Sequence, residues 1–441
     1  MKRLLVLFSF LTAVTCHLSP AYATQVQEVT SPGGIKAWLV EEHALPLVAI
    51  KMAFRNSGTA YDPKGKEGRA TMTAALLLEG AGDMDSRAFN EALENDAIEL
   101  NFATDEDSFR ASLVTLSEHK EKAFSYLGLA LTHPRFDDSA TERVRSQTLS
   151  TLAQEEKNPS YILHRQWEQA AFGQHPYANP ALGSKESVSA LARSDFADVA
   201  QHYLTHENIL IAVVGDMTVA ELSHLLDAHF ATLPAHYAAD VTVPEVSLPS
   251  QAKQRIVQNP IPQTMAIFAT QGVKRDDPRY YAAYVMNYII GGADLRSRLA
   301  QEIRIKRGLA YSVYSMEEPM IHGAVWKGGF ATRNAQVGSA VTALHSTLQE
   351  FADYGPTDKE MQDAKTYITG SFVLGLDSNA DIANYLISMQ LYHLGRDYLD
   401  KRNGLIEAVS KDDVKAIAKK LTDPSHLVMV MVGQPDLSAG K

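Results

Sequence analysis

The chain of 441 residues is almost without cysteine, because Cys16 is the single one. One thiol forms no intramolecular disulfide and builds no multi-thiolate metal site, so the fold depends on its apolar cores. The sequence also lacks a G-x-S-x-G motif, which leaves serine hydrolase chemistry unsupported. It has no apolar run long enough to cross a membrane. The missing motif removes serine-based hydrolysis from the candidate activities. Thiol-based hydrolysis is removed as well, because Cys16 lies within the N-terminal segment that we expect to be cleaved.

The N-terminal region has the pattern of a secretory signal. Lys2 and Arg3 precede an apolar run at residues 4–14, and residues 21–23 (AYA) form a small-x-small cleavage site. The run is too short to be a membrane anchor. We therefore expect a signal peptide at residues 1–23, cleavage near Ala23, and a periplasmic or secreted mature chain that has no cysteine and no transmembrane segment.

Basic charge is scarce relative to acidic charge. The chain has 41 Lys and Arg residues against 52 Asp and Glu residues, which gives a formal net charge of −11. Nucleic acids and anionic membrane surfaces attract proteins of the opposite sign. We therefore expect neither as a partner.

The rest of the sequence contains an internal duplication. Three landmarks recur in the same order and at similar spacing: an apolar strand, a helix that ends in glycine, and a late apolar strand that also ends in glycine. They lie at residues 46–54 and 264–272, before Gly80 and before Gly291, and at residues 209–215 and 427–433. The sequence therefore predicts two homologous domains.

A stretch with several prolines separates the two copies. Pro234, Pro244 and Pro249 lie in it among few long apolar runs, which is typical of an extended linker. We expect an N-terminal domain at residues 24–232, a linker at 233–258 and a C-terminal domain at 259–437. Each copy mixes strands with long helical patterns, so the predicted fold class is α+β.

Residues 65–80 carry a resemblance to a known family. They read GKEGRATMTAALLLEG, a glycine loop that leads into an apolar helical run. Together with the segments at 134–137 (PRFD), 172–177 (FGQHPY) and 213–217 (VVGDM), this stretch resembles the pitrilysin/insulinase family of zinc peptidases. In that family the helix carries H-x-x-E-H, whose histidines bind Zn²⁺ while the glutamate activates water. The resemblance implies two homologous α/β-roll domains that face each other across a cleft.

The metal ligands that the resemblance implies are missing from this chain. Thr71, Ala74 and Ala75 stand at the His, Glu and His positions, and the later glutamate position falls on Ser150 or Thr151. Methyl groups coordinate nothing, and a threonine hydroxyl is a poor zinc ligand beside imidazole or carboxylate. We expect this motif to be degenerate and the chain to hold no metal and no other cofactor.

Other polar clusters give weaker signals. His202 and His206 lie four residues apart, but no acidic residue stands between them, so a separate zinc site is disfavoured. The run at residues 105–107 (DED) is typical of a solvated turn.

The second copy keeps one feature of the family's active site. Residues 297–315 read SRLAQEIRIKRGLAYSVYS, a helical pattern that changes to a strand pattern at Gly308. The resemblance identifies Arg304 and Tyr311 as the pair that stabilises the scissile carbonyl as it gains negative charge. Spacing alone favours a surface arginine in a basic helix and a core tyrosine on a strand. The resemblance favours the substrate-binding pair instead.

The leading hypothesis is a non-metal subunit of an exported zinc metallopeptidase. A homologous partner subunit bearing H-x-x-E-H supplies zinc in the heterodimer, while Arg304 and Tyr311 complete the cleft and hold the peptide substrate in trans. One alternative is a catalytically inactive structural or peptide-binding protein. A further alternative is a zinc endopeptidase that acts on its own.

Overall fold

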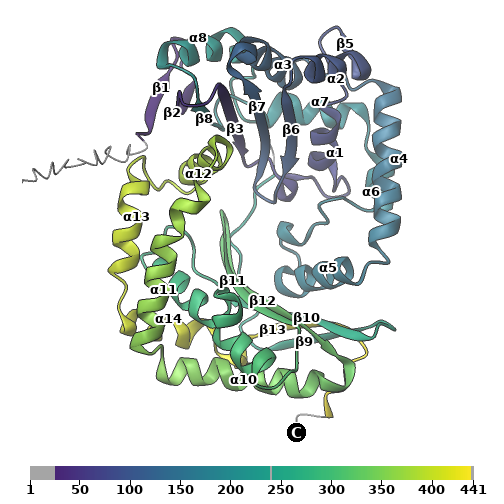
Figure 1. Ribbon diagram of the computed structural model, residues 1–441. Helices are drawn as coiled ribbons and strands as arrows, with labels where there is room; N and C mark the ends of the chain where they lie inside the picture. Colours follow the sequence, from purple (N-terminus) through teal and green to yellow (C-terminus); the bar gives the residue numbers. More distant parts are fainter. Residues whose placement is uncertain (1–24, 239–240, 439–441) are drawn as a thin grey trace, which may run out of the picture.

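A computed structural model of the chain describes residues 25–238 and 241–438. The predicted signal peptide lies outside these residues. Within them, two β-sheets carry the helices (Figure 1). The first sheet has the order β1-β2-β8-β3-β7-β6. Its strands are β1 (Gln27–Thr30), β2 (Lys36–Glu41), β3 (Leu47–Arg55), β6 (Glu99–Thr104), β7 (Ser108–Leu116) and β8 (Ile209–Gly215), and a separate short hairpin joins β4 (Gly80–Ala81) to β5 (Met84–Asp85).

The second sheet has the order β11-β12-β10-β13-β9. Its strands are β9 (Lys253–Gln258), β10 (Gln263–Gln271), β11 (Ser312–Met320), β12 (Gly323–Arg333) and β13 (Val428–Gly433). Strand β9 lies within the range predicted as linker, and it pairs in parallel with β13 at the sheet edge. The second sheet therefore begins before residue 259.

The two sheets repeat one another. The order β2-β8-β3-β7-β6 in the first matches β9-β13-β10-β12-β11 in the second. In both of these matched orders, the first pair is parallel (β2 with β8, β9 with β13) and the pairs that follow are antiparallel. The predicted α+β fold of two homologous domains is confirmed.

Helices flank both sheets, and local sequence signals start several of them. Asn158 accepts a hydrogen bond from the Ser160 amide and Pro159 occupies the first turn of α5, which together fix its N-terminus. The first copy contains α1 (Arg69–Leu76), α2 (Ser86–Asn95), α3 (Lys120–Thr132), α4 (Asp138–Glu155), α5 (Pro159–Phe172), α6 (Lys185–Ala190), α7 (Arg193–His202) and α8 (Val219–Phe230). The second contains α9 (Tyr280–Asn287), α10 (Val337–Tyr354), α11 (Asp358–Gly370), α12 (Asn379–Leu391), α13 (Tyr398–Glu407) and α14 (Lys411–Leu421), with two π-helical segments, η4 (Tyr288–Gly292) and η6 (Ala300–Ile305).

One helix of each copy packs on the sheet of the other copy. Helix α5 packs on β10 and β13 of the second sheet, and α12 packs on β3 and β8 of the first (Figure 1). Along β8, Ile211 and Val213 belong to the first copy's own core, whereas the alternate residues Ala212 and Val214 contact the core that contains α12. Because alternate strand residues point to opposite faces, each copy covers a face that the other leaves open. The two copies are therefore packed against each other through these two exchanged helices.

None of the helices at residues 25–238 and 241–438 has the length and apolar character needed to cross a membrane.

Candidate functional site

The glycine loop and helix α1 form the frame that the sequence predicted. Gly68 begins the helix with a φ of +90°, and a Cβ at this position would lie 2.8 Å from the Leu182 carbonyl oxygen. Only glycine combines this backbone conformation with that close approach. The buried carboxylate of Asp62 accepts hydrogen bonds from the Gly68 and Ala70 amides, each at 3.0 Å. These contacts fix the N-terminus of α1, because its first amides have no partner within the helix.

The three degenerate motif positions have different environments on α1. Thr71 donates a hydrogen bond from Oγ1 to the Ala181 carbonyl oxygen at 2.7 Å, so its hydroxyl is used in the packing of a neighbouring loop. Ala74 is 3% exposed and belongs to the first core, whereas Ala75 is exposed. A Zn²⁺ ion does not fit these residues, because no nitrogen or carboxylate donor is present. Across the described residues, no group of three His, Cys, Asp or Glu side chains could hold a metal ion.

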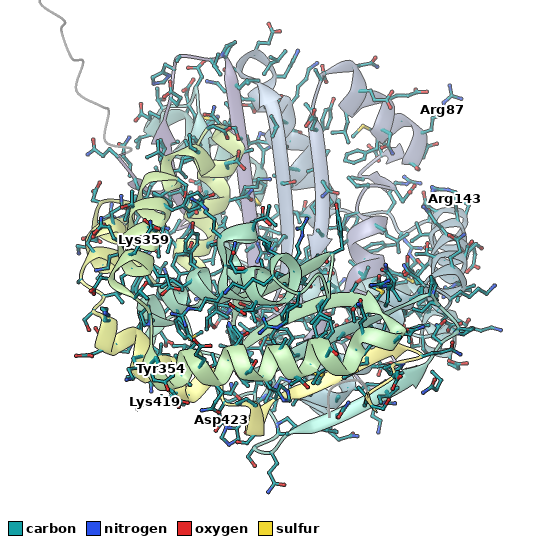
Figure 2. All side chains as sticks on the ribbon, turned by 60° about the horizontal axis from the view of Figure 1, so that its bottom comes forward. Arg87, Arg143, Tyr354, Lys359, Lys419 and Asp423 are labelled. Atoms are coloured by element: carbon teal, nitrogen blue, oxygen red, sulfur yellow. The ribbon has the colours of Figure 1, made fainter. Side chains whose placement is uncertain are left out.

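Helix α4 carries the position of the third family ligand. Ser150 and Thr151 are both exposed there and neither is acidic. The helix is instead tied to the end of the α1 segment by an ion pair between Arg143, labelled in Figure 2, and Glu79. Arg143 Nη1 lies 2.9 Å from Glu79 Oε1, and this contact holds the pKa of Glu79 below its usual range. The Glu79 carboxylate, near the end of the α1 segment, is thus used in a structural contact.

His202 at the end of α7 and His206 in the turn that follows do not converge. His202 Nδ1 lies 2.8 Å from Asp198 Oδ1, and His206 Nε2 lies 2.7 Å from the Phe230 carbonyl oxygen. The two imidazoles therefore have separate partners.

The structure brings Arg304 and Tyr311 together. Arg304 lies in the π-helical segment η6, and Tyr311 directly precedes β11. The guanidinium carbon lies 4.9 Å from the centroid of the Tyr311 ring, within the range of a cation–π contact. Tyr311 is 80% exposed, so the expectation of a core tyrosine does not apply to it.

Arg304 differs from its two basic neighbours in its contacts. Lys306 Nζ and Arg307 Nη1 each lie 2.5 Å from a carboxylate oxygen of Glu302. Within the described residues, the Arg304 side chain forms no ion pair, and its guanidinium makes a cation–π contact with the ring of Tyr311. Its guanidinium donors are thus free to bind an external acceptor.

The exposed face of β11 continues the surface beside Tyr311. Tyr314 and Met316 are 42% and 41% exposed, while the alternate residues Val313 and Ser315 are buried. Strand β11 lies at the edge of the second sheet, so one of its backbone sides has no strand partner. An exposed tyrosine–methionine face on an edge strand is suited to contact an extended polypeptide.

The turn after β11 is fastened to the first copy. The Ile321 amide donates to Asp107 Oδ2 at 2.9 Å, and the Tyr177 hydroxyl donates to Asp107 Oδ1 at 2.5 Å while accepting from the His322 amide at 3.1 Å. Burial raises the pKa of Asp107, although the Tyr177 hydroxyl opposes this shift. The expectation of a solvated acidic turn is therefore wrong for Asp107. Sequence spacing does not predict these contacts, because the partners are between 70 and 214 residues apart.

Two family models match this chain. Residues 43–185 match the insulinase (peptidase family M16) model, and residues 190–368 match the peptidase M16 inactive domain. The chain belongs to the peptidase M16 family. The matched residues include α1 with its degenerate motif and the Arg304–Tyr311 pair.

Individual M16 relatives span nearly the whole chain. A Helicobacter pylori protein named non-peptidase homolog YmxG is 27% identical over 395 residues, which are 89% of this chain and 90% of the relative. The mitochondrial-processing peptidase subunit beta of Lentinula edodes is 23% identical over 397 residues, covering 86% of this chain and 84% of the relative. A crystal structure of a peptidase M16 inactive domain from Pseudomonas fluorescens has a TM-score of 0.86 at 28% identity and covers 93% of this chain and 98% of that chain. These matches extend over both copies, so the whole described chain, and not one domain alone, resembles M16 proteins.

Proposed function

We propose that this protein is the non-metal subunit of an exported heterodimeric zinc peptidase. In this assembly a homologous partner bearing H-x-x-E-H supplies the zinc, and this chain contributes Arg304 and Tyr311 to the substrate cleft. The observation that carries the proposal is the state of this pair: the two side chains touch, and the guanidinium has no carboxylate partner at residues 25–238 and 241–438. The M16 membership and the lost ligand positions support the assignment of zinc binding to the partner and of substrate contacts to this chain.

The chemistry of the pair suits a developing oxyanion. A guanidinium and a phenol are hydrogen-bond donors that gain strength when the acceptor becomes negatively charged. Because Arg304 contacts the ring of Tyr311, each side chain restricts the other, and a donor fixed in place loses less entropy when it binds. The pair would hold the substrate carbonyl while the partner subunit performs the hydrolysis.

The names of two relatives support parts of this proposal. The Helicobacter pylori relative is named a non-peptidase homolog, and the Lentinula edodes relative is named as one subunit of a processing peptidase. Export remains a prediction from the pattern at residues 1–23. A periplasmic location would place the proposed heterodimer with exported or surface peptides as substrates.

Reconstitution tests the proposal. The mature chain is purified alone and together with an H-x-x-E-H-bearing homologue from the same genome, and zinc content and peptide cleavage are measured for both preparations. We expect a stable heterodimer that contains zinc and cleaves peptides, and an isolated chain that contains none and cleaves nothing. Stoichiometric zinc with chelator-sensitive cleavage in the isolated chain would instead identify a zinc endopeptidase that acts on its own.

A second candidate function is peptide binding without catalysis. The exposed Tyr314 and Met316 on edge strand β11 favour it, because they offer a docking face that needs no metal. This alternative predicts that the isolated chain binds peptides and that its variants at Arg304 leave the partner's cleavage unchanged. The kinetic experiment described in the Discussion separates the two functions.

A further inference from the structure

A cavity of about 220 Å³ lies within the second copy, away from Arg304 and Tyr311. Its walls come from α9, α12 and α13, with Pro319 of β11 closing one side. Six tyrosines and two arginines contribute to the lining, and the arginines are Arg275 and Arg402. The tyrosines are Tyr280, Tyr281, Tyr284, Tyr385, Tyr392 and Tyr398. Apolar ring faces around two cations form an uncommon combination for a structural void.

Arg275 is held by aromatic rings and not by a carboxylate. Its guanidinium carbon lies 4.1 Å from the Tyr280 ring centroid and 5.2 Å from those of Tyr281 and Tyr398. Its Nη2 donates to the Tyr398 hydroxyl at 2.6 Å and to the Tyr281 hydroxyl at 3.3 Å. Both of these hydrogen bonds use Nη2. The N–H groups on Nη1 and Nε of the planar guanidinium can therefore donate to a further acceptor.

Arg402 is the second cation of the cavity and is only 6% exposed. Its Nη1 donates to the Asn403 side chain at 3.0 Å and to the Ile368 carbonyl oxygen at 3.3 Å, and its guanidinium carbon lies 4.0 Å from the Phe372 ring centroid. All of these partners are neutral. Neither Arg275 nor Arg402 forms an ion pair with any acidic side chain of the described residues, although buried charges are normally paired.

The buried acid Glu317 does not neutralise this charge. Glu317 acts electrostatically on Tyr280, which stacks on Arg275, but it makes no ion pair with either arginine. Burial raises the pKa of Glu317 to about 8, so this carboxyl is mostly protonated at neutral pH. The cavity therefore carries two positive charges and no anion from the described part of the chain.

We propose that this cavity binds the carboxylate of a small organic acid, with the anion on the free edge of Arg275 and an apolar body against the tyrosine rings. The planar guanidinium matches a carboxylate through two parallel hydrogen bonds. The remaining lining is largely apolar, including Met389, Leu394 and Ile406, which favours an acid with an aromatic or branched body over inorganic phosphate. The proposal is independent of zinc and of the proposed heterodimer.

Calorimetric titration of the full mature chain tests the site with a matched pair of probes. Phenylacetate carries the carboxylate and the aromatic body, while phenylacetamide has nearly the same shape without the charge. We expect phenylacetate to bind in a one-to-one ratio and phenylacetamide to bind at least about tenfold more weakly, because the charge-assisted hydrogen bonds are lost. Equal binding of the two probes, or binding of neither at millimolar concentration, would overturn the proposal without any need for a variant.

A pair of variants places the ligand on Arg275. Arg275→Gln removes the one of the two cavity cations that we assign to the carboxylate. It is expected to weaken phenylacetate binding about tenfold or more. Arg279→Gln is the control, because Arg279 is exposed, pairs with Asp277 and does not line this cavity. Circular dichroism confirms that both variants are folded. Unchanged affinity in folded Arg275→Gln would overturn the assignment.

Two further probes distinguish the sources of the carboxylate. Free acids and the C-terminus of a peptide offer the same group, so N-acetyl-phenylalanine and a heptapeptide ending in phenylalanine are titrated beside phenylacetate. Binding of all three supports a site that accepts peptide C-termini, and binding of phenylacetate alone supports a site for free acids. Inorganic phosphate that binds as tightly as phenylacetate would overturn the assigned ligand class.

Discussion

The Arg304 guanidinium lies against the ring of Tyr311, with 4.9 Å between its central carbon and the ring centroid. The two residues are on either side of a turn at Gly308, whose amide donates to the Arg304 carbonyl oxygen at 3.0 Å. Gly308 has a φ of +59°, a conformation that other residues adopt at a cost. The turn thus sets the contact between the two side chains, and each of them orients the other.

This contact predicts a kinetic effect in the heterodimer. Arg304→Ala and Tyr311→Phe each remove a donor and should lower kcat/KM for peptide cleavage roughly a hundredfold, the usual effect of losing one oxyanion donor. The affinity of the two subunits should stay the same, because Tyr311 is exposed and neither side chain is a core residue. Steady-state kinetics with the reconstituted pair measure this effect.

The matched control for this experiment is Arg307→Ala. Arg307 lies in the same segment, but its guanidinium is engaged by Glu302 at 2.5 Å. We expect this variant to cleave peptides at close to the wild-type rate. Equal losses in Arg304→Ala and Arg307→Ala would point to a general effect of positive charge and contradict a specific role for Arg304.

The degenerate motif predicts a difference in stability between two neighbouring substitutions. Ala74→Glu places a carboxylate at a position that is 3% exposed and packed in the core, whereas Ala75→Glu places it at an exposed position. We expect the first to lower the free energy of unfolding by about 2–5 kcal/mol, and the second to change it by less than about 0.5 kcal/mol. Urea unfolding measures both. A near-neutral Ala74→Glu would show that α1 still tolerates the family's catalytic glutamate.

The sequence predicted the duplication but not how the copies join. Repeated landmarks such as residues 46–54 and 264–272 were sufficient to infer two similar domains, because each keeps its own pattern of apolar strands. Apolar periodicity shows that a helix buries one face, but it does not show which sheet receives that face. The packing of α5 on β13 and of α12 on β8 therefore became visible only in three dimensions.

The candidate site shows a similar division. The resemblance placed Arg304 and Tyr311 in the sequence, but their contact depends on a π-helical segment, which local propensity does not predict. Asp107 was interpreted as part of a solvated turn because a run of acids is usually exposed. Its burial follows from the hydrogen bonds with Ile321 and Tyr177, which are distant in sequence.

We expect the backbone amides of the turn after β11 to lose protection from hydrogen exchange when the contact that anchors this turn is removed. Tyr177→Phe removes the hydroxyl that donates to Asp107 and accepts from the His322 amide. We expect a loss of about 1–3 kcal/mol in stability, because two partly buried polar groups lose a partner. Hydrogen exchange should speed up at His322 and its neighbours before it does so in the central strands. Tyr354→Phe is the control, since Tyr354 is 77% exposed at the end of α10 (Figure 2).

Glu317 predicts a dependence of stability on pH. Both of its carboxylate oxygens are buried, and within the described part of the chain neither forms an ion pair. Burial raises its pKa from 4.5 to about 8. Between these values the unfolded chain releases a proton that the folded chain retains, so the free energy of unfolding falls as pH rises, by roughly 2–4 kcal/mol in total.

Glu317→Gln should remove this part of the pH dependence, because the amide stays neutral at every pH. Chemical unfolding at several pH values between 5 and 9 is expected to show that the variant gains stability over the wild type toward the alkaline end. Glu318→Gln is the control, because Glu318 forms an ion pair with Lys327. This variant loses a favourable contact, but its free energy of unfolding should still fall as pH rises. If Glu317→Gln and the wild type lose stability in parallel as pH rises, the buried carboxyl of Glu317 is not the group that titrates.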